Sequence, residues 1–117
     1  MDPNAAAKER MTPLLSQELF EELLGAKPAA RLAIVYFTAK WCGPCKRVPL
    51  GKILDNTAAA AHWYLCDVDD NTYTPGYCQV KSIPSFLAIV DGKPMPLFVQ
   101  SDADKVIAWV NNIVSEM

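Results

Sequence analysis

The chain has 117 residues, a length typical of one domain that buries its core without help from disulfides or metals. Its composition is 51% hydrophobic and 21% charged, and its formal net charge of −2 offers no basic field to nucleic acid or to an anionic membrane. No apolar run approaches the roughly 20 residues of a membrane-spanning helix. We therefore expect neither nucleic acid nor membrane as a partner.

The N-terminal segment lacks the apolar core of a signal peptide, and its Asp2 and Glu9 are untypical of an organellar presequence. We expect residues 1–10 to be a flexible lead-in, residues 11–117 to form a single domain, and the protein to be cytoplasmic. In that reducing compartment a close cysteine pair is more often catalytic or metal-binding than structural.

The pattern of apolar residues in the first half predicts strands alternating with helices. A brief strand over residues 11–15 precedes a helix that Ser16 caps. The apolar run over residues 32–37, rich in β-branched and aromatic side chains, is typical of a strand buried on both faces. A helix is expected to follow Cys45 and to kink at Pro49, because proline removes a hydrogen bond from a helix interior.

The second half continues the alternation and ends in a hairpin and a helix. The expected elements are a strand over residues 62–68, a short helix near 72–78, and strands over 85–90 and 95–99. Asp91-Gly92 is a hairpin signal, and Ser101 with Asp104 resembles a capping pair for the last helix. This order predicts parallel crossovers followed by an antiparallel pair, an α/β fold with helices on both faces of a mixed sheet.

Two cysteines, Cys42 and Cys45, lie where the strand expected over residues 32–37 is followed by a helix. A Cys-x-x-Cys pair in that setting is a specific signal for thiol–disulfide chemistry. Only a thiolate attacks a disulfide, and the unpaired N–H groups and dipole of a helix N-terminus lower a thiol pKa. We predict that Cys42 attacks a substrate disulfide and that Cys45 then resolves the mixed disulfide.

A structural pair or half of a zinc site is the alternative interpretation of these cysteines. Zinc needs about four ligands, and His62, Cys66 and Cys78 supply no second paired motif, so no metal or other cofactor is expected. Cys66 is expected to be an inert buried thiol. Cys78 is expected to be a packing residue, with regulatory oxidation as the alternative.

The motif Trp41-Cys42-Gly43-Pro44-Cys45-Lys46 resembles the active-site signature of the thioredoxin family. The similarity covers almost the whole chain, including Asp67-Val68-Asp69 and Ile83-Pro84-Ser85 in the family's order. It implies the thioredoxin fold and the activity of a protein-disulfide reductase with disulfide-containing proteins as substrates. It also implies an NADPH-dependent thioredoxin reductase as the electron donor.

The resemblance further implies the residues that bind substrate. Pro84 would be cis and lie beside the redox disulfide, and the peptide group before it, at Ile83, would pair with the substrate backbone. Trp41, Gly43 and Pro44 would complete the contact surface.

Four positions depart from the family pattern. Tyr36 replaces a buried aspartate that exchanges protons with the second cysteine, and Leu65 replaces the lysine that pairs with it in bacterial members. Gln100 replaces a glycine after the last strand, and Pro49 stands one residue nearer the second cysteine than usual. A buried tyrosine is a poor base at neutral pH. We therefore expect Cys45 to release substrate more slowly than in aspartate-bearing homologues, with water or substrate taking the proton.

Two other functions are weighed against the reductase. A protein-binding module would use Trp41, Ile83 and Pro84 but would have no need of both cysteines. An oxidase or isomerase usually has a histidine between its cysteines, where this chain has Gly43-Pro44.

Overall fold

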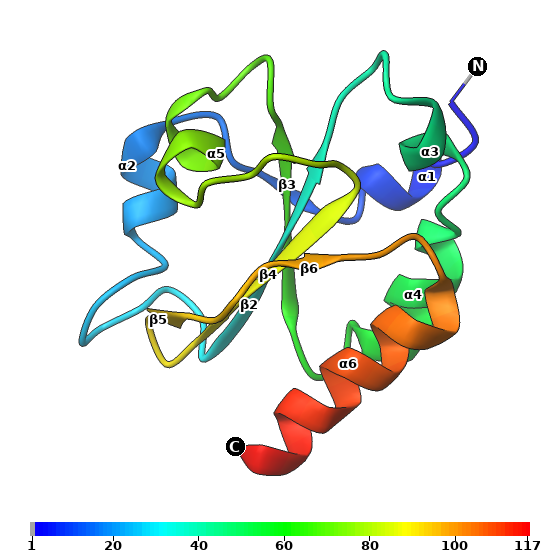
Figure 1. Ribbon diagram of the computed structural model, residues 1–117. Helices are drawn as coiled ribbons and strands as arrows, with labels where there is room; N and C mark the ends of the chain where they lie inside the picture. The colour runs from blue at the N-terminus through cyan, green and yellow to red at the C-terminus, as the bar shows by residue number, and fades with distance from the viewer. Residues whose placement is uncertain (1) are drawn as a thin grey trace.

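A central sheet with helices on both faces organises the chain (Figure 1). The computed structural model describes residues 2–117. The strands of this part are β1 Thr12–Pro13, β2 Leu32–Thr38, β3 His62–Asp67, β4 Ser85–Val90, β5 Lys93–Pro94 and β6 Phe98–Val99. The helices are α1 Ala5–Lys8, α2 Gln17–Glu21, α3 Gly43–Lys46, α4 Leu50–Thr57, α5 Tyr73–Tyr77 and α6 Ala103–Glu116. The predicted α/β class is confirmed.

The sheet is mixed, in the order β1-β3-β2-β4-β5, and β6 also pairs with β4. β3 runs parallel to β1 and β2, whereas β4 runs antiparallel to β2. The prediction that residues 85–90 follow a parallel crossover was therefore wrong. The connection over residues 68–84, which contains α5, stays at the end of the sheet where β3 ends. β4 thus starts where β3 ended, with Ser85 opposite Phe37.

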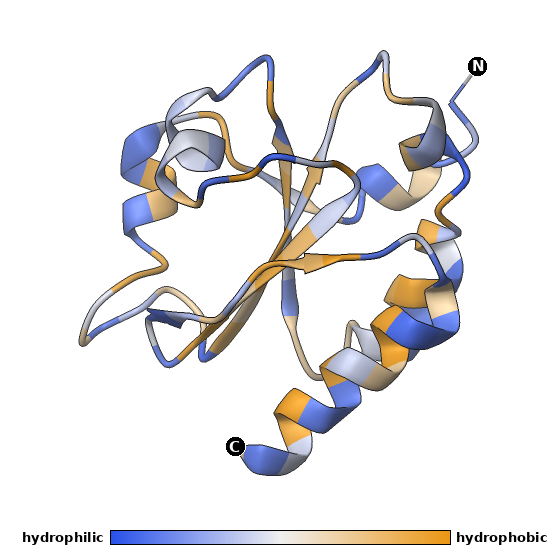
Figure 2. Ribbon diagram, viewed as in Figure 1, coloured by the Kyte–Doolittle hydropathy of each residue, from blue (hydrophilic) through white to orange (hydrophobic). Residues whose placement is uncertain are grey.

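Every residue of β2 is buried, and successive side chains enter different apolar layers because strand side chains alternate between faces. Ile34 and Tyr36 belong to the layer that α1, α4 and α6 cover. Val35 and Phe37 belong to the layer on the opposite face, with Phe20 of α2. Figure 2 shows hydrophobic colour along the central strands and along one stripe of α6.

The helix expected after Cys45 is two helices rather than one kinked helix. α3 ends at Lys46, and Pro49 is the N-cap of α4, where the N–H that proline lacks would have no partner inside the helix. The predicted cap of the last helix also needs correction. Asp102 is the N-cap of α6 and accepts hydrogen bonds from the backbone N–H groups of Asp104 and Lys105 at 2.9 and 3.2 Å. Within residues 2–117, no helix is long and apolar enough to cross a membrane.

The segment expected to be a flexible lead-in contains α1, which packs against α4. Asn4, just before α1, is buried. Its side-chain amide donates to the carbonyl of Cys45 at 3.3 Å and accepts from the N–H of Leu50 at 3.4 Å. These contacts hold the start of the chain against the segment that carries the cysteine pair. The division of the chain at residue 10 stays a prediction.

Candidate active site

Cys42 and Cys45 lie beyond the C-terminal end of β2, at the start of α3, and form a disulfide with their Cα atoms 5.3 Å apart. Each is 3% exposed and packs with Ala39, Val68 and Ile83. The pair predicted from the sequence is therefore close enough for intramolecular exchange.

Backbone N–H groups favour a negative charge on Cys42. Cys42 is the N-cap of α3, and the backbone N–H of Cys45 donates to its Sγ at 3.1 Å. A hydrogen bond from an N–H is stronger to a thiolate than to a thiol, so this contact favours the nucleophilic form. Gly43 and Pro44 form the exposed first turn of α3, where Pro44 removes an N–H that would be unpaired.

The peptide bond between Ile83 and Pro84 is cis, as the family resemblance implied. The carbonyl oxygen of Ile83 is 3.9 Å from Cys42 Sγ, and Pro84 is buried. The loop before β4 is therefore brought next to the first cysteine.

Trp41 is 69% exposed, and its Nε1 donates to the carboxylate of Asp69 at 2.8 Å. This bond joins the loop after β2 to the loop after β3. A cavity of about 150 Å³ is lined by Trp41, Val68, Pro75, Val80, Lys81, Ser82 and Ile83. Largely apolar side chains thus form a surface beside the disulfide.

Tyr36 occupies the layer beneath Cys45. Its hydroxyl donates to the carbonyl oxygen of Cys45 at 3.3 Å, and burial raises the pKa of Tyr36 to about 12. Leu65 is its neighbour on β3, so the two departures from the family pattern pair across adjacent strands. Because neither Tyr36 nor Leu65 is charged, this position has no buried charge that needs an oppositely charged partner.

Tyr36→Phe is expected to change the response of stability to alkaline pH. The pKa of Tyr36 is about 12 in the folded protein and 10 for an ordinary tyrosine, so the folded state holds the phenol proton more tightly than the unfolded state. That stabilisation is present below pH 10 and is lost between pH 10 and 12. Over this pH interval the free energy of unfolding of the wild type should fall by about 2 kcal/mol more than that of the variant. At pH 7 the variant should be about 1 kcal/mol less stable than the wild type, because it lacks the hydrogen bond to the Cys45 carbonyl. Urea unfolding at each pH measures the free energy of unfolding of the wild type and of the variant. If the two free energies changed in parallel with pH, Tyr36 would not have the raised pKa.

The two other cysteines are free thiols with little tendency to ionise. Burial raises the pKa of Cys66 to about 12 and that of Cys78 to about 11. These values agree with the interpretation of Cys66 as an inert thiol. Within residues 2–117, no group of three or more His, Cys, Asp or Glu side chains is arranged to hold a metal ion.

Sequence reasoning missed two residues of this region. Asp69, which bonds Trp41, enters the sequence analysis only as part of a family motif, and Asn4 falls in the expected lead-in. Neither carries a local sequence signal for its contact, because both partners are distant along the chain. Gln100 accepts hydrogen bonds from the N–H groups of Ser101 and Asp102 at 3.0 and 3.1 Å, which orders the start of α6.

Comparison with known proteins agrees with this geometry. A family model described as Thioredoxin matches residues 11–112. The chain is 32% identical to thioredoxin of Homo sapiens over 100 residues, which cover 85% of this chain and 94% of that protein. It is 35% identical over 88 residues to the TPR repeat-containing thioredoxin TDX of Arabidopsis thaliana, covering 74% of this chain but only 23% of that longer protein.

The fold also matches solved structures. Mitochondrial thioredoxin 3 from Saccharomyces cerevisiae, in its oxidised form, superposes with a TM-score of 0.80 at 22% identity, covering 91% of this chain and 98% of that one. Thioredoxin from Malassezia sympodialis superposes with a TM-score of 0.77 at 25% identity, covering 90% and 94%. With its bonded cysteine pair, the chain belongs to the thioredoxin family and is a thioredoxin-like protein-disulfide oxidoreductase.

Proposed function

We propose that Cys42 is the nucleophile and Cys45 the resolving thiol of a disulfide reductase. The observation that carries this assignment is the bonded pair, in which the N–H of Cys45 faces Cys42 Sγ. The Cys42 thiolate attacks a substrate disulfide and releases one substrate thiol. Cys45 then attacks Cys42 Sγ, releases the second thiol and leaves the Cys42–Cys45 disulfide.

The substrate-binding residues are Trp41, Gly43, Pro44, Ile83 and Pro84. Trp41 offers an exposed aromatic face, and the carbonyl of Ile83 lies next to Cys42 Sγ, where it can accept a hydrogen bond from an extended substrate backbone. The apolar cavity between them supports binding of an apolar substrate side chain next to the disulfide.

The electron donor in this proposal is an NADPH-dependent thioredoxin reductase, which would restore the dithiol after each cycle and support electron transport and cell redox homeostasis. The compartment is the cytoplasm. Two free thiols, Cys66 and Cys78, support a reducing environment, since cysteines in oxidising compartments are mostly paired.

A protein-binding module with weak or specialised redox activity is the second candidate. The replacement of a buried aspartate by Tyr36 favours it, because the tyrosine hydroxyl is committed to the carbonyl of Cys45 and has a pKa of about 12. Such a module would keep the Trp41 and Ile83 surface while relying little on turnover.

Cys45→Ser separates these functions. Without the resolving thiol, substrates should stay attached to Cys42 after exposure to cell extract, and a reductant should release them. The Cys42→Ser/Cys45→Ser protein is the matched control and should trap nothing by disulfide. Many trapped proteins support a general reductase and one dominant protein a dedicated module, whereas none would contradict disulfide exchange at Cys42.

A further inference from the structure

Cys45 must lose a proton before it can resolve a mixed disulfide, and the residues described so far do not accept it. Cys45 is 3% exposed, so bulk water has little access. The Tyr36 hydroxyl donates to the Cys45 carbonyl, and burial raises its pKa to about 12. A phenol in that state is no proton acceptor at neutral pH.

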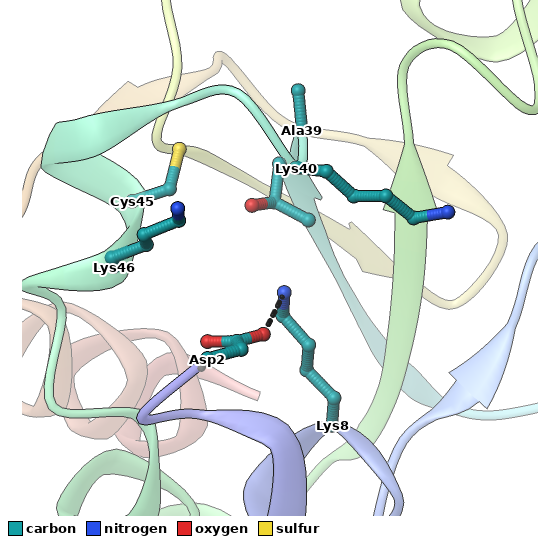
Figure 3. Close-up of a pocket in the computed structure, with 7 residues that line it drawn as sticks. Asp2, Lys8, Ala39, Lys40, Cys45 and Lys46 are labelled. Carbon is teal, nitrogen blue, oxygen red and sulfur yellow. Dashed lines mark hydrogen bonds and ion pairs between the residues drawn. The ribbon is translucent and has the colours of Figure 1, made fainter.

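A second cavity of about 150 Å³ reaches Cys45 from the side of the N-terminal segment (Figure 3). Its lining is Asp2, Lys8, Thr38, Ala39, Lys40, Cys45 and Lys46. Asp2 provides the one carboxylate among these residues. The buried Oγ1 of Thr38 also lines the cavity and has no hydrogen-bond partner among the described residues. A cavity of this size and polarity has room for water that bridges these groups.

Asp2 is fixed at this cavity by hydrogen bonds. Its carboxylate accepts from Lys8 Nζ at 2.7 Å and from the N–H of Asn4 at 2.9 Å. Asn4 in turn bonds the carbonyl of Cys45 and the N–H of Leu50. Asn4 therefore links the Asp2 carboxylate to the backbone of Cys45 through hydrogen bonds.

The charges around the cavity suit a proton transfer from Cys45. The hydrogen bond from the Lys8 ammonium holds the pKa of Asp2 below its usual range, so the carboxylate is ionised at neutral pH and keeps an accepted proton only briefly before passing it to water. Lys8, Lys40 and Lys46 line the cavity and give it a net positive charge, which favours the Cys45 thiolate that remains.

We propose that Asp2 accepts the proton of Cys45 through water in this cavity as Cys45 resolves the mixed disulfide. This role rests on the proposed function of the cysteine pair. The Cys45 proton passes to the Asp2 carboxylate, and the thiolate forms a bond to Cys42 Sγ. The bond from Cys42 to the substrate sulfur breaks, and its electron pair leaves on that sulfur. The two cysteines are oxidised and the substrate is reduced. Solvent then protonates the substrate thiolate. In a separate step, Asp2 gives its proton to water and is ready for the next cycle.

Stoichiometric Ellman's reagent resolves the two steps on the reduced protein. Attack by Cys42 releases one thionitrobenzoate, and resolution by Cys45 releases the second.

Asp2→Asn keeps an oxygen for the Asn4 N–H but cannot take a proton. We expect it to slow the second release by tenfold or more at pH 7 and to leave the first unchanged, within the range of general-base effects. Formate should restore part of the lost rate, compared with chloride at equal ionic strength.

Asp104→Asn is the matched control, because Asp104 also pairs with a lysine, Lys52 at 2.8 Å, away from the cavity. It should change neither release. An unchanged second release in Asp2→Asn would overturn the proposal, and so would a slowed release that formate does not restore, which would indicate a packing role. If the wild type itself gave only one thionitrobenzoate, the proposed function of Cys45 would fail instead.

Discussion

Cys42→Ser is expected to abolish disulfide reduction, lowering the rate by on the order of 10³-fold or more. A serine hydroxyl is not ionised at neutral pH, so the variant lacks the thiolate that starts the cycle. Cys45 remains, but it lies inside α3 rather than at its N-cap, so its thiol lacks the helix N-terminal position that Cys42 has. Insulin reduction with dithiothreitol as the electron source measures this effect without any assumption about the natural reductase.

Cys78→Ser is the control for this experiment. Cys78 is a half-buried free thiol whose pKa burial raises to about 11, and it lies outside the cysteine pair. The variant should keep the wild-type rate. Activity retained by Cys42→Ser within tenfold of the wild type would show that another group is the nucleophile.

Phe86→Ala is expected to lower the free energy of unfolding by about 3–5 kcal/mol, the usual cost of removing a buried phenylalanine ring. Phe86 is fully buried in β4. Its ring stacks on Tyr36 at 5.1 Å between centroids and meets Trp63 edge-on at 6.0 Å. Trp109 of α6 lies 6.3 Å away, so the ring joins the sheet to the last helix. Urea denaturation followed by circular dichroism measures the loss.

Leu15→Ala removes a side chain that is 64% exposed and should change the free energy of unfolding by less than about 0.5 kcal/mol. A Phe86→Ala variant as stable as Leu15→Ala would mean that the layer between β4 and α6 packs much more loosely than these ring contacts indicate.

Much of the fold was predictable because its signals are local. The apolar run of β2, the hairpin at Asp91-Gly92 and the stripe of α6 each follow from short-range pattern. The direction of β4 is not predictable in this way, because it depends on the path of the whole connection over residues 68–84 rather than on a local pattern. The sequence predicts the place of the break at Pro49, but the structure has two separate helices there rather than one kinked helix.

In the candidate site too, residues with a local sequence pattern are predictable and contacts between distant residues are not. Cys42 and Cys45 are only three residues apart, and their spacing alone indicates the redox pair, whereas the cis bond at Pro84 follows only from the family resemblance. The contacts of Asn4 and Asp2 with the region around Cys45 join residues about 40 positions apart. No pattern in a polar, alanine-rich start of a chain indicates such contacts, because they arise only when α1 packs against α4.

The position of β2 has a consequence for how the protein behaves during turnover. This strand is buried along its whole length, has paired neighbours on both sides, and ends four residues before Cys42. Amides in such a strand typically exchange with solvent only when large parts of a protein open, so the redox pair follows a backbone segment that we expect to open slowly. Electrons can therefore be gained and passed on while the supporting scaffold stays in place.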